Sequence, residues 1–300
     1  MKRAKERGGV TIIVMAAMVA LLGLGAVVVD GGLLYYHHAR LQSAVDVAAL
    51  TGARVLAAGG SAQAVTQAMS LAQANGLALQ EVQIAVNLLS NSVTVGARRE
   101  VALGLARILG QPRAAVVVSA TAAGQTIGAL RGAVPLGVVW RGFTFGQVYD
   151  LKVGGGEGEE GWYGAVDLGL KGGGAAEYRE HLRHGWEGLL RVGDDVPLKT
   201  GNMSGPTQDA IRDRLERCNH LPRCTFQLHA AQCSRLLIVP VVTPPHHGSV
   251  VVVGFAGFFV DSLPGSGNES TIRGRFIEFV GVGEAGVGAS FGARKFSLIN

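Results

Sequence analysis

The sequence has little charge, few aromatic residues and only three cysteines. Charged residues make up 16% of the 300 residues, and aromatic residues make up 6%. Basic and aromatic residues are not interleaved as nucleic-acid grooves require, so we expect no nucleic-acid partner. The motifs GxSxG, HExxH and SxxK are also missing from the chain. Because these patterns mark common catalytic sites, we expect no catalytic residues and a protein that is not an enzyme.

The net charge of +5 is concentrated at the N-terminus. Lys2, Arg3, Lys5 and Arg7 together with Glu6 contribute +3 within the first nine residues. The rest of the chain is close to neutral. The basic isoelectric point therefore reflects a short tail and not a nucleic-acid-binding surface.

A long apolar segment follows this tail. Residues 10–29 contain no charge and end at Asp30. Twenty apolar residues are about the length of a helix that crosses a bilayer core. A basic tail before such a helix stays in the cytoplasm. We therefore predict a cytoplasmic tail at 1–9, a transmembrane helix at 10–29, and a single-pass protein whose bulk lies outside the cytoplasm.

Three fates of this segment are open. It is a cleaved signal peptide, a pilin-type leader cut after Gly9, or an uncleaved anchor. The long run and its Val-Val-Val-Asp exit favour the anchor, because signal peptides have a shorter apolar region and a small-residue cleavage site. Ala16 and Ala20 are four residues apart, a spacing that lets membrane helices approach and form a homo-oligomer, although ordinary lipid-facing alanines explain it better.

Apolar residues continue at helical spacing after Asp30. They recur at Leu34, Leu41, Val45, Ala48 and Val55. This spacing predicts an amphipathic helix over 30–58, either bent at Gly31-Gly32 or continuous with the membrane helix.

A specific motif lies across this junction. After the apolar run come Asp30-Gly31-Gly32, then Arg40-Leu41-Gln42, then Asp46-x-Ala48-Ala49-Leu50-x-Gly52-Ala53. In this order the residues resemble the N-terminal signature of TadE/TadG-like Flp pilus-assembly proteins, over about residues 8–55. The resemblance implies a protein of the bacterial cytoplasmic (inner) membrane, with other Tad/Flp membrane proteins or pilins, and membrane lipid, as partners. It also implies that Asp30, Arg40, Gln42 and Asp46 are signature positions for packing or assembly.

The remaining chain predicts two further segments, and an α+β fold overall. Residues 59–125 read as a small α+β module with a helix at 61–76, strands at 82–86 and 92–97, a short helix at 99–109 and a strand at 114–122. A long helix that leads into a small sheet is similar in outline to pilins. Residues 130–300 read as a β-rich extracytoplasmic domain with helices at 178–190 and 208–217, Thr207 as an N-cap, and strands at 235–242, 249–261 and 274–282. The acidic, glycine-rich residues 154–162 read as a surface loop.

All three cysteines lie close together, with a histidine between them. Cys218, His220, Cys224 and Cys233 fall within sixteen residues. Outside the cytoplasm a disulfide is chemically permitted, and three cysteines leave one unpaired. Thiolates and imidazole also suit zinc, although the spacing is not that of a zinc ribbon. We expect a disulfide and no cofactor, with a zinc site or fully reduced thiols as alternatives.

Together these features predict a membrane-anchored accessory or structural component of Tad (Flp) pilus assembly or of a related surface-secretion system. The alternative is a membrane-tethered extracytoplasmic module that binds a ligand or metal. A membrane-tethered enzyme fits less well, because no nucleophile with a positioned base is evident.

Overall fold

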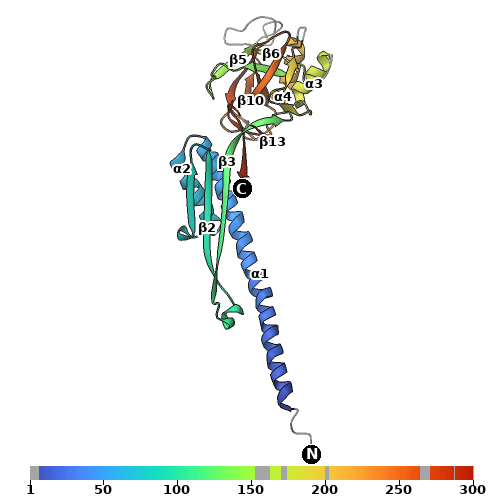
Figure 1. The fold of residues 1–300 in the computed structure, drawn as a ribbon. Helices are drawn as coiled ribbons and strands as arrows, with labels where there is room; N and C mark the ends of the chain where they lie inside the picture. Colours follow the sequence, from blue (N-terminus) through green and yellow to red (C-terminus); the bar gives the residue numbers. More distant parts are fainter. Residues whose placement is uncertain are drawn as a thin grey trace, which may run out of the picture. The chain divides into compact units, whose positions relative to one another are not determined.

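The computed structural model describes residues 7–152, 163–169, 174–199, 203–230, 232–263, 271–286 and 288–299. The chain forms two compact units: unit 1 is Met1–Gly124 with Phe296–Asn300, and unit 2 is Gln125–Lys295. Unit 1 contains a long N-terminal helix, and unit 2 is rich in strands (Figure 1). The predicted α+β class is confirmed.

One continuous helix, α1 (Arg7–Ala57), contains both the apolar run and the amphipathic segment. Gly31 and Gly32 do not interrupt it, because both lie within the 51-residue helix. The large apolar side chains described between Val10 and Val29 are exposed. Among the described residues, α1 is the one helix long and apolar enough to cross a membrane.

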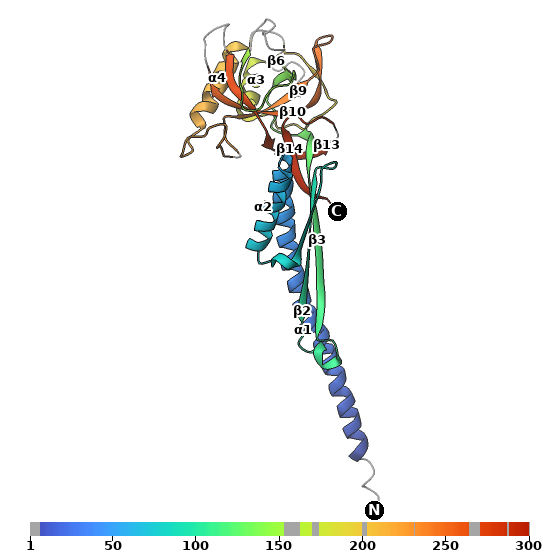
Figure 2. The same ribbon diagram turned by 90° about the vertical axis from the view of Figure 1, so that its left-hand side faces the viewer.

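The second half of α1 packs into the core of unit 1. Figure 1 and Figure 2 both show α2 and strands β2 and β3 beside this half, while the first half extends beyond them. Its buried apolar residues recur at three- and four-residue spacing, which places them on one face of the helix. They are Leu41, Ala44, Val45, Ala48, Ala49, Ala53 and Leu56. Helix α2 (Ser61–Ala74) buries Ala64, Ala68 and Ala72. The many small residues let the two helices approach closely.

Three antiparallel strands complete unit 1. After a short 3₁₀ helix η1 (Leu79–Glu81), β1 (Val82–Asn87) pairs with β2 (Ser92–Ala102), and β2 pairs with the first part of β3 (Arg113–Leu130). Alternate residues of β2 and β3 are buried, as the period of a half-buried strand requires. They include Val93, Val95, Ala97, Val116, Val118 and Ala120.

The helix predicted at 99–109 is wrong. β2 runs on to Ala102, and only the 3₁₀ turn η2 (Ala106–Leu109) follows. The residues 98–102 have good intrinsic helix propensity, but this preference is weak against tertiary pairing. Val101 is buried and each residue of this stretch pairs with β3, so these residues adopt the extended conformation of a strand.

The main sheet of unit 2 has the order β5-β11-β10-β9-β4-β6, and β8 also pairs with β10. These strands are β4 (Leu136–Val139), β5 (Val148–Lys152), β6 (Tyr163–Ala165), β8 (Asp195–Pro197), β9 (Leu236–Val242), β10 (Ser249–Ser262) and β11 (Thr271–Ile277). The end of β3 pairs with β7 (Leu190–Arg191) and β13 (Gly283–Gly286), while β12 (Phe279–Val280) runs parallel to β14 (Ala293–Ile299). The strands predicted at 235–242 and 249–261 correspond to β9 and β10. The strand predicted at 274–282 is divided, because β11 ends at Ile277 and β12 lies in the other sheet.

Two helices pack on this sheet. Tyr178 and Leu182 of α3 (Ala175–His184) and Ile211 of α4 (Ser204–Arg217) share a core with residues of β9 and β10. The Tyr178 hydroxyl lies 3.0 Å from the hydroxyl of Thr207 in a buried hydrogen bond. Burial raises the pKa of Tyr178 to about 12.

Both helices differ from their predicted bounds. Helix α3 ends at His184, because Gly185 takes a φ of 86° that a helix cannot continue. Helix α4 begins at Ser204 after Met203, so Thr207 is a buried helical residue and not the N-cap. The acidic loop predicted at 154–162 lies outside the described residues.

The C-terminal residues differ from the domain bounds that the sequence predicts. Phe296–Asn300 belong to unit 1 and not to the segment 130–300. Phe296 packs against the core of unit 1, and its ring lies beside Gly124, where an added Cβ would come within 2.9 Å of it. Contacts between residues that are far apart in the sequence, such as Gly124 and Phe296, leave no pattern among neighbouring residues that could predict them.

Candidate functional site

Asp30, the residue that ends the apolar run, is buried in unit 1. Its side chain is 4% exposed. The two carboxylate oxygens accept hydrogen bonds from the backbone N–H groups of Gly104 at 2.8 Å and Ala106 at 2.6 Å. Charge-assisted bonds of this type are about twice as strong as neutral ones. Asp30 therefore ties α1 to the hairpin between β2 and β3.

The tip of that hairpin meets α1 at the end of the apolar run. The side chain of Leu105 lies beside Gly25, where a Cβ would be 3.5 Å from it. The neighbouring Ile108 is 70% exposed. The apolar hairpin tip and the end of the predicted membrane span therefore coincide along α1.

The other polar signature residues are partly brought together. Gln42 donates from Nε2 to Asp46 Oδ1 at 2.7 Å and to the carbonyl oxygen of Ser119 in β3 at 3.1 Å. Asp46 is half-buried, and its carboxylate orients the Gln42 amide that joins α1 to the sheet. Arg40 is exposed and donates to the Tyr36 hydroxyl at 3.3 Å. Asp30 lies twelve residues before Gln42, about 18 Å along a helix, so the signature residues are spread along α1.

Gly52 is a close-approach position that the sequence analysis did not single out. A Cβ added there would come within 2.9 Å of Val93 Cγ1 and 3.2 Å of Ala68 Cβ. Helix α1 therefore meets both β2 and α2 at Gly52. Its place inside the signature motif was the available signal.

An ion pair that the sequence analysis missed joins η1 to β2. Arg99 donates from Nε and Nη2 to the two carboxylate oxygens of Glu81, at 2.6 and 2.7 Å. The Ala78 N–H donates to the same carboxylate at 2.8 Å. The Arg99 hydrogen bonds hold the pKa of Glu81 below its ordinary value.

Replacing Glu81 with glutamine should reduce the stability of unit 1 at pH 7 by about 1 kcal/mol, because the pair is mostly shielded yet still reached by solvent. A lowered carboxyl pKa contributes stability above the unfolded value of about 4.3, and that stability is lost as the pH falls through the folded pKa. The thermal unfolding midpoints of Glu81→Gln and the unmodified chain should therefore differ at pH 7, and the difference should shrink as the pH falls below about 4.3.

The matched control is Glu100→Gln, which removes the exposed pair with Arg98. This substitution should leave the thermal unfolding midpoint unchanged both at pH 7 and at acidic pH. Equal effects of the two substitutions would contradict a special role for Glu81.

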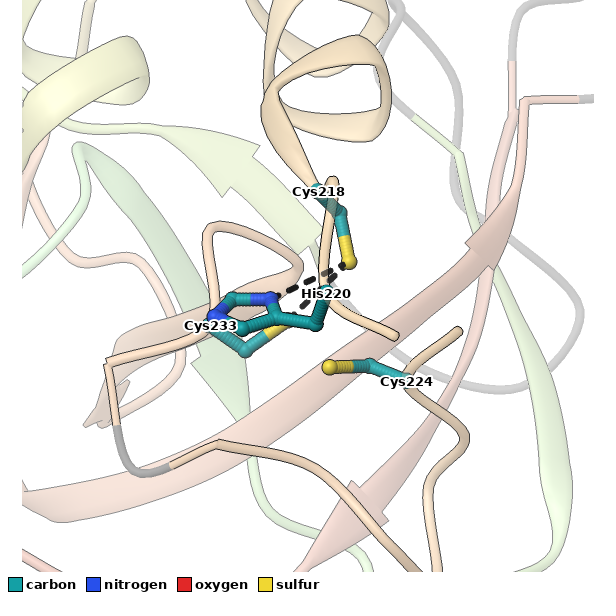
Figure 3. A group of neighbouring side chains, drawn as sticks. All are labelled: Cys218, His220, Cys224 and Cys233. Carbon is teal, nitrogen blue, oxygen red and sulfur yellow. Dashed lines mark hydrogen bonds between the residues drawn. The ribbon is translucent and has the colours of Figure 1, made fainter. Parts of the chain in front are cut away.

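The three cysteines and His220 converge in unit 2. One donor atom from each residue lies within 4.8 Å of the other three. The sulfurs of Cys218 and Cys233 are 3.5 Å apart, and Cys218 Sγ is 3.8 Å from His220 Nδ1. Figure 3 shows the three thiols and the imidazole directed toward one another. All three cysteine side chains are buried and free, whereas His220 is exposed.

The connection between α4 and β9 positions this cluster. Cys218 follows the last residue of α4, and two residues, Ser234 and Arg235, separate Cys233 from β9. The described residues between Arg217 and Leu236 form no helix or strand. The cysteines pack with Phe259 and Ile277 in a small apolar core. Long connections without secondary structure are uncommon in compact domains and usually carry a function.

Two buried arginines hold the same connection. Arg235 donates to the carbonyl oxygens of Cys224, Val260 and Asp261 at 3.0, 2.8 and 2.7 Å. Arg214 donates to the carbonyl oxygens of Leu182, Ser234 and Leu236. Desolvation lowers the pKa of Arg214 to about 10.

The surroundings shift the pKa values of two of the thiols in opposite directions. The backbone N–H of Ala230 lowers the pKa of Cys224, while burial raises the pKa of Cys233 to about 12. Buried sulfurs have little access to a substrate, whereas three sulfurs and one imidazole nitrogen are a suitable donor set for a soft metal ion. The arrangement can therefore hold a metal or form one disulfide.

Within the described residues, the chain has one candidate membrane-spanning helix. The second half of this helix packs on a small sheet, and unit 2 is β-rich. Residues 8–55 match the family model for Flp pilus-assembly TadE/G-like proteins. The match covers the apolar run and the packed half of α1 almost to its end. Residues 8–55 are thus similar to TadE/G-like Flp pilus-assembly proteins, and the expected resemblance is confirmed. No curated protein and no solved structure matches.

Proposed function

We propose that this protein is a membrane-anchored accessory or structural component of Tad (Flp) pilus assembly or of a related surface-secretion system. The match over residues 8–55 carries the proposal. In it, residues 10–29 of α1 lie in the bacterial cytoplasmic membrane, the basic tail is in the cytoplasm, and both folded units are outside. No reaction is assigned to the chain.

The packing of unit 1 supports an assembly role. Asp30 and Gln42 fasten α1 to the β2–β3 hairpin and to β3, at two levels along the helix. A rigid unit is thereby built directly onto the end of the apolar run. The partners we propose are other Tad/Flp membrane proteins or pilins, with a second copy of this chain reached through Ala16 and Ala20 in the membrane.

A second candidate function is an extracytoplasmic metal- or ligand-binding module tethered to the membrane. The convergence of Cys218, His220, Cys224 and Cys233 favours it. This role is compatible with the first, because the cluster lies in unit 2 and the pilus-assembly match lies in unit 1.

A protease-protection experiment tests the topology. Epitope tags are placed before Met1 and after Asn300. Bacterial cells are stripped of any outer membrane, so that the cytoplasmic membrane stays sealed, and are then treated with protease. We expect loss of the C-terminal tag and survival of the N-terminal tag in the membrane fraction, because the positive-inside rule keeps the basic tail in the cytoplasm.

The control is the same treatment after lysis, which should remove both tags. A C-terminal tag that stays protected in intact cells would overturn the orientation. Deletion of the gene in the native bacterium should then reduce assembled Flp pili on the cell surface, and re-expression of the chain should restore them. Normal piliation of the deletion strain would contradict the assembly role.

A further inference from the structure

The donor atoms of the cysteine cluster are arranged as a four-coordinate site. Tetrahedral zinc binds sulfur at about 2.3 Å and nitrogen at about 2.0 Å, which separates two sulfurs by about 3.8 Å and a sulfur from a nitrogen by about 3.5 Å. The Cys218 and Cys233 sulfurs are 3.5 Å apart, and Cys218 Sγ lies 3.8 Å from His220 Nδ1. Both separations differ by about 0.3 Å from those around one shared zinc ion.

A disulfide explains the cluster less completely. It would join two sulfurs at about 2.05 Å and leave the third thiol and the imidazole beside the bond without a role. Instead, all four donor atoms lie within 4.8 Å of one another. A fourth ligand that comes from an exposed loop residue, His220, is not needed by a disulfide but completes a tetrahedron.

The buried charges next to the cluster give an independent reason. Arg214 and Arg235 are only 6% and 9% exposed, and their guanidinium groups donate to backbone carbonyl oxygens. Asp213 and Asp261 form ion pairs with Arg217 and Arg275. Asp213 also acts electrostatically on Arg214 and favours its charged form. Burying a cation is costly, and negative charge placed close to it reduces that cost.

Three thiolates and a neutral imidazole around a divalent ion carry a net charge of −1. Arg235 donates to the carbonyl of Cys224, and Arg214 donates to the carbonyl of Ser234, the residue after Cys233. A metal–thiolate centre would therefore place negative charge beside these two guanidinium groups. A disulfide is neutral and would not.

We propose that Cys218, His220, Cys224 and Cys233 bind one structural zinc ion. The ion would replace a large apolar core in fixing the connection between α4 and β9. Three buried sulfurs and one exposed imidazole leave no open coordination position, which is the arrangement of a structural and not a catalytic zinc.

The test uses the full chain, purified in detergent without chelators. Metal content is measured by elemental mass spectrometry. The intact mass of the protein is measured without reductant, so that any disulfide is kept. We expect about one zinc per chain and three thiols that react with an alkylating agent after the metal is stripped. A chain free of metal, whether it carries a disulfide or three free thiols, would overturn the proposal, and so would iron or copper in place of zinc.

Cobalt provides a readout that needs no substitution. The stripped chain with Co²⁺ should show thiolate-to-cobalt charge transfer and the visible bands of a tetrahedral ion, and zinc should abolish both. A spectrum without these bands would count against the site even if zinc were present elsewhere.

Substitutions assign the ligands. Cys218→Ser, Cys224→Ser and Cys233→Ser should each lower the bound zinc, and His220→Ala should weaken binding by at least about tenfold while it leaves the sulfurs in place. His229→Ala is the matched control, because His229 lies in the same connection but outside the four converging residues. Zinc loss in His229→Ala but not in His220→Ala would overturn the assignment of the fourth ligand.

Discussion

Gly52→Leu is expected to destabilise unit 1 by about 3 kcal/mol, since overpacking a closed core costs about 1–3 kcal/mol or somewhat more. The first added carbon would already lie within 2.9 Å of Val93, which is completely buried. Leucine favours the helix more than glycine does, so the loss cannot come from helix propensity. Hydrogen exchange of the β2 and β3 amides should accelerate about a hundredfold, since about 1.4 kcal/mol corresponds to a factor of ten.

Gly32→Leu is the matched control in the same helix. A Cβ at Gly32 would meet no heavy atom within 4 Å. This substitution should leave exchange in the sheet unchanged or slower. Comparable acceleration by the two variants would show that Gly52 is not a close-packing position.

Asp30→Ala is expected to release the hairpin between β2 and β3 from α1. It removes the acceptor of two backbone N–H groups, those of Gly104 and Ala106. Each buried donor left without a partner costs about 1–3 kcal/mol, although rearrangement of the hairpin tip toward water will recover part of this. We expect the amides of both residues to exchange about a hundredfold faster, a change of roughly 3 kcal/mol.

Asp30→Asn is the graded comparison. Asparagine keeps one oxygen as an acceptor but loses the charge, so its effect should be smaller than that of alanine. The β1 amides, far from the hairpin tip along the strands, should be little affected in both variants. If the Gly104 and Ala106 amides exchange at the same rate in both variants as in the unmodified chain, Asp30 does not hold the hairpin.

If both expectations hold, the TadE/G-like signature acquires a physical meaning in this chain. Gly52 allows α1 to lie against β2 and α2, Gln42 with Asp46 joins α1 to β3, and Asp30 fixes the hairpin tip. These are contacts that hold a small sheet to the end of a membrane helix. A proposed assembly component needs such a rigid connection between its anchor and its exposed surfaces.

The α-helices and six of the strands, β1, β2, β3, β9, β10 and β11, could be predicted because their signals are local. The uncharged run before Asp30 and the three- and four-residue spacing after it are properties of neighbouring residues. They predicted both halves of α1, but they left open whether the helix bends at Gly31-Gly32. Runs rich in Val, Ile and Phe predicted β9, β10 and β11 in the same way. The prediction for 99–109 failed where local helix propensity opposed pairing with β3.

The candidate site was visible in the sequence only as a set of residues. The spacing of Cys218, Cys224 and Cys233 was compatible with a disulfide, a metal or free thiols, because spacing alone does not say where the donor atoms point. The return of the chain from α4 to β9 brings all three sulfurs and His220 together. The buried arginines beside them had no sequence signal, since an arginine is normally exposed.

Residue patterns were therefore sufficient to predict the candidate membrane span, the resemblance of residues 8–55 to TadE/G-like proteins and the α+β class. Tertiary structure alone decided why Gly52 is a glycine, what Asp30 binds, and which four donor atoms meet in unit 2. The physical reason is the range of the interactions. Hydrophobic periodicity acts between residues a few positions apart, whereas Asp30 reaches Gly104 and Gln42 reaches Ser119 across more than seventy residues.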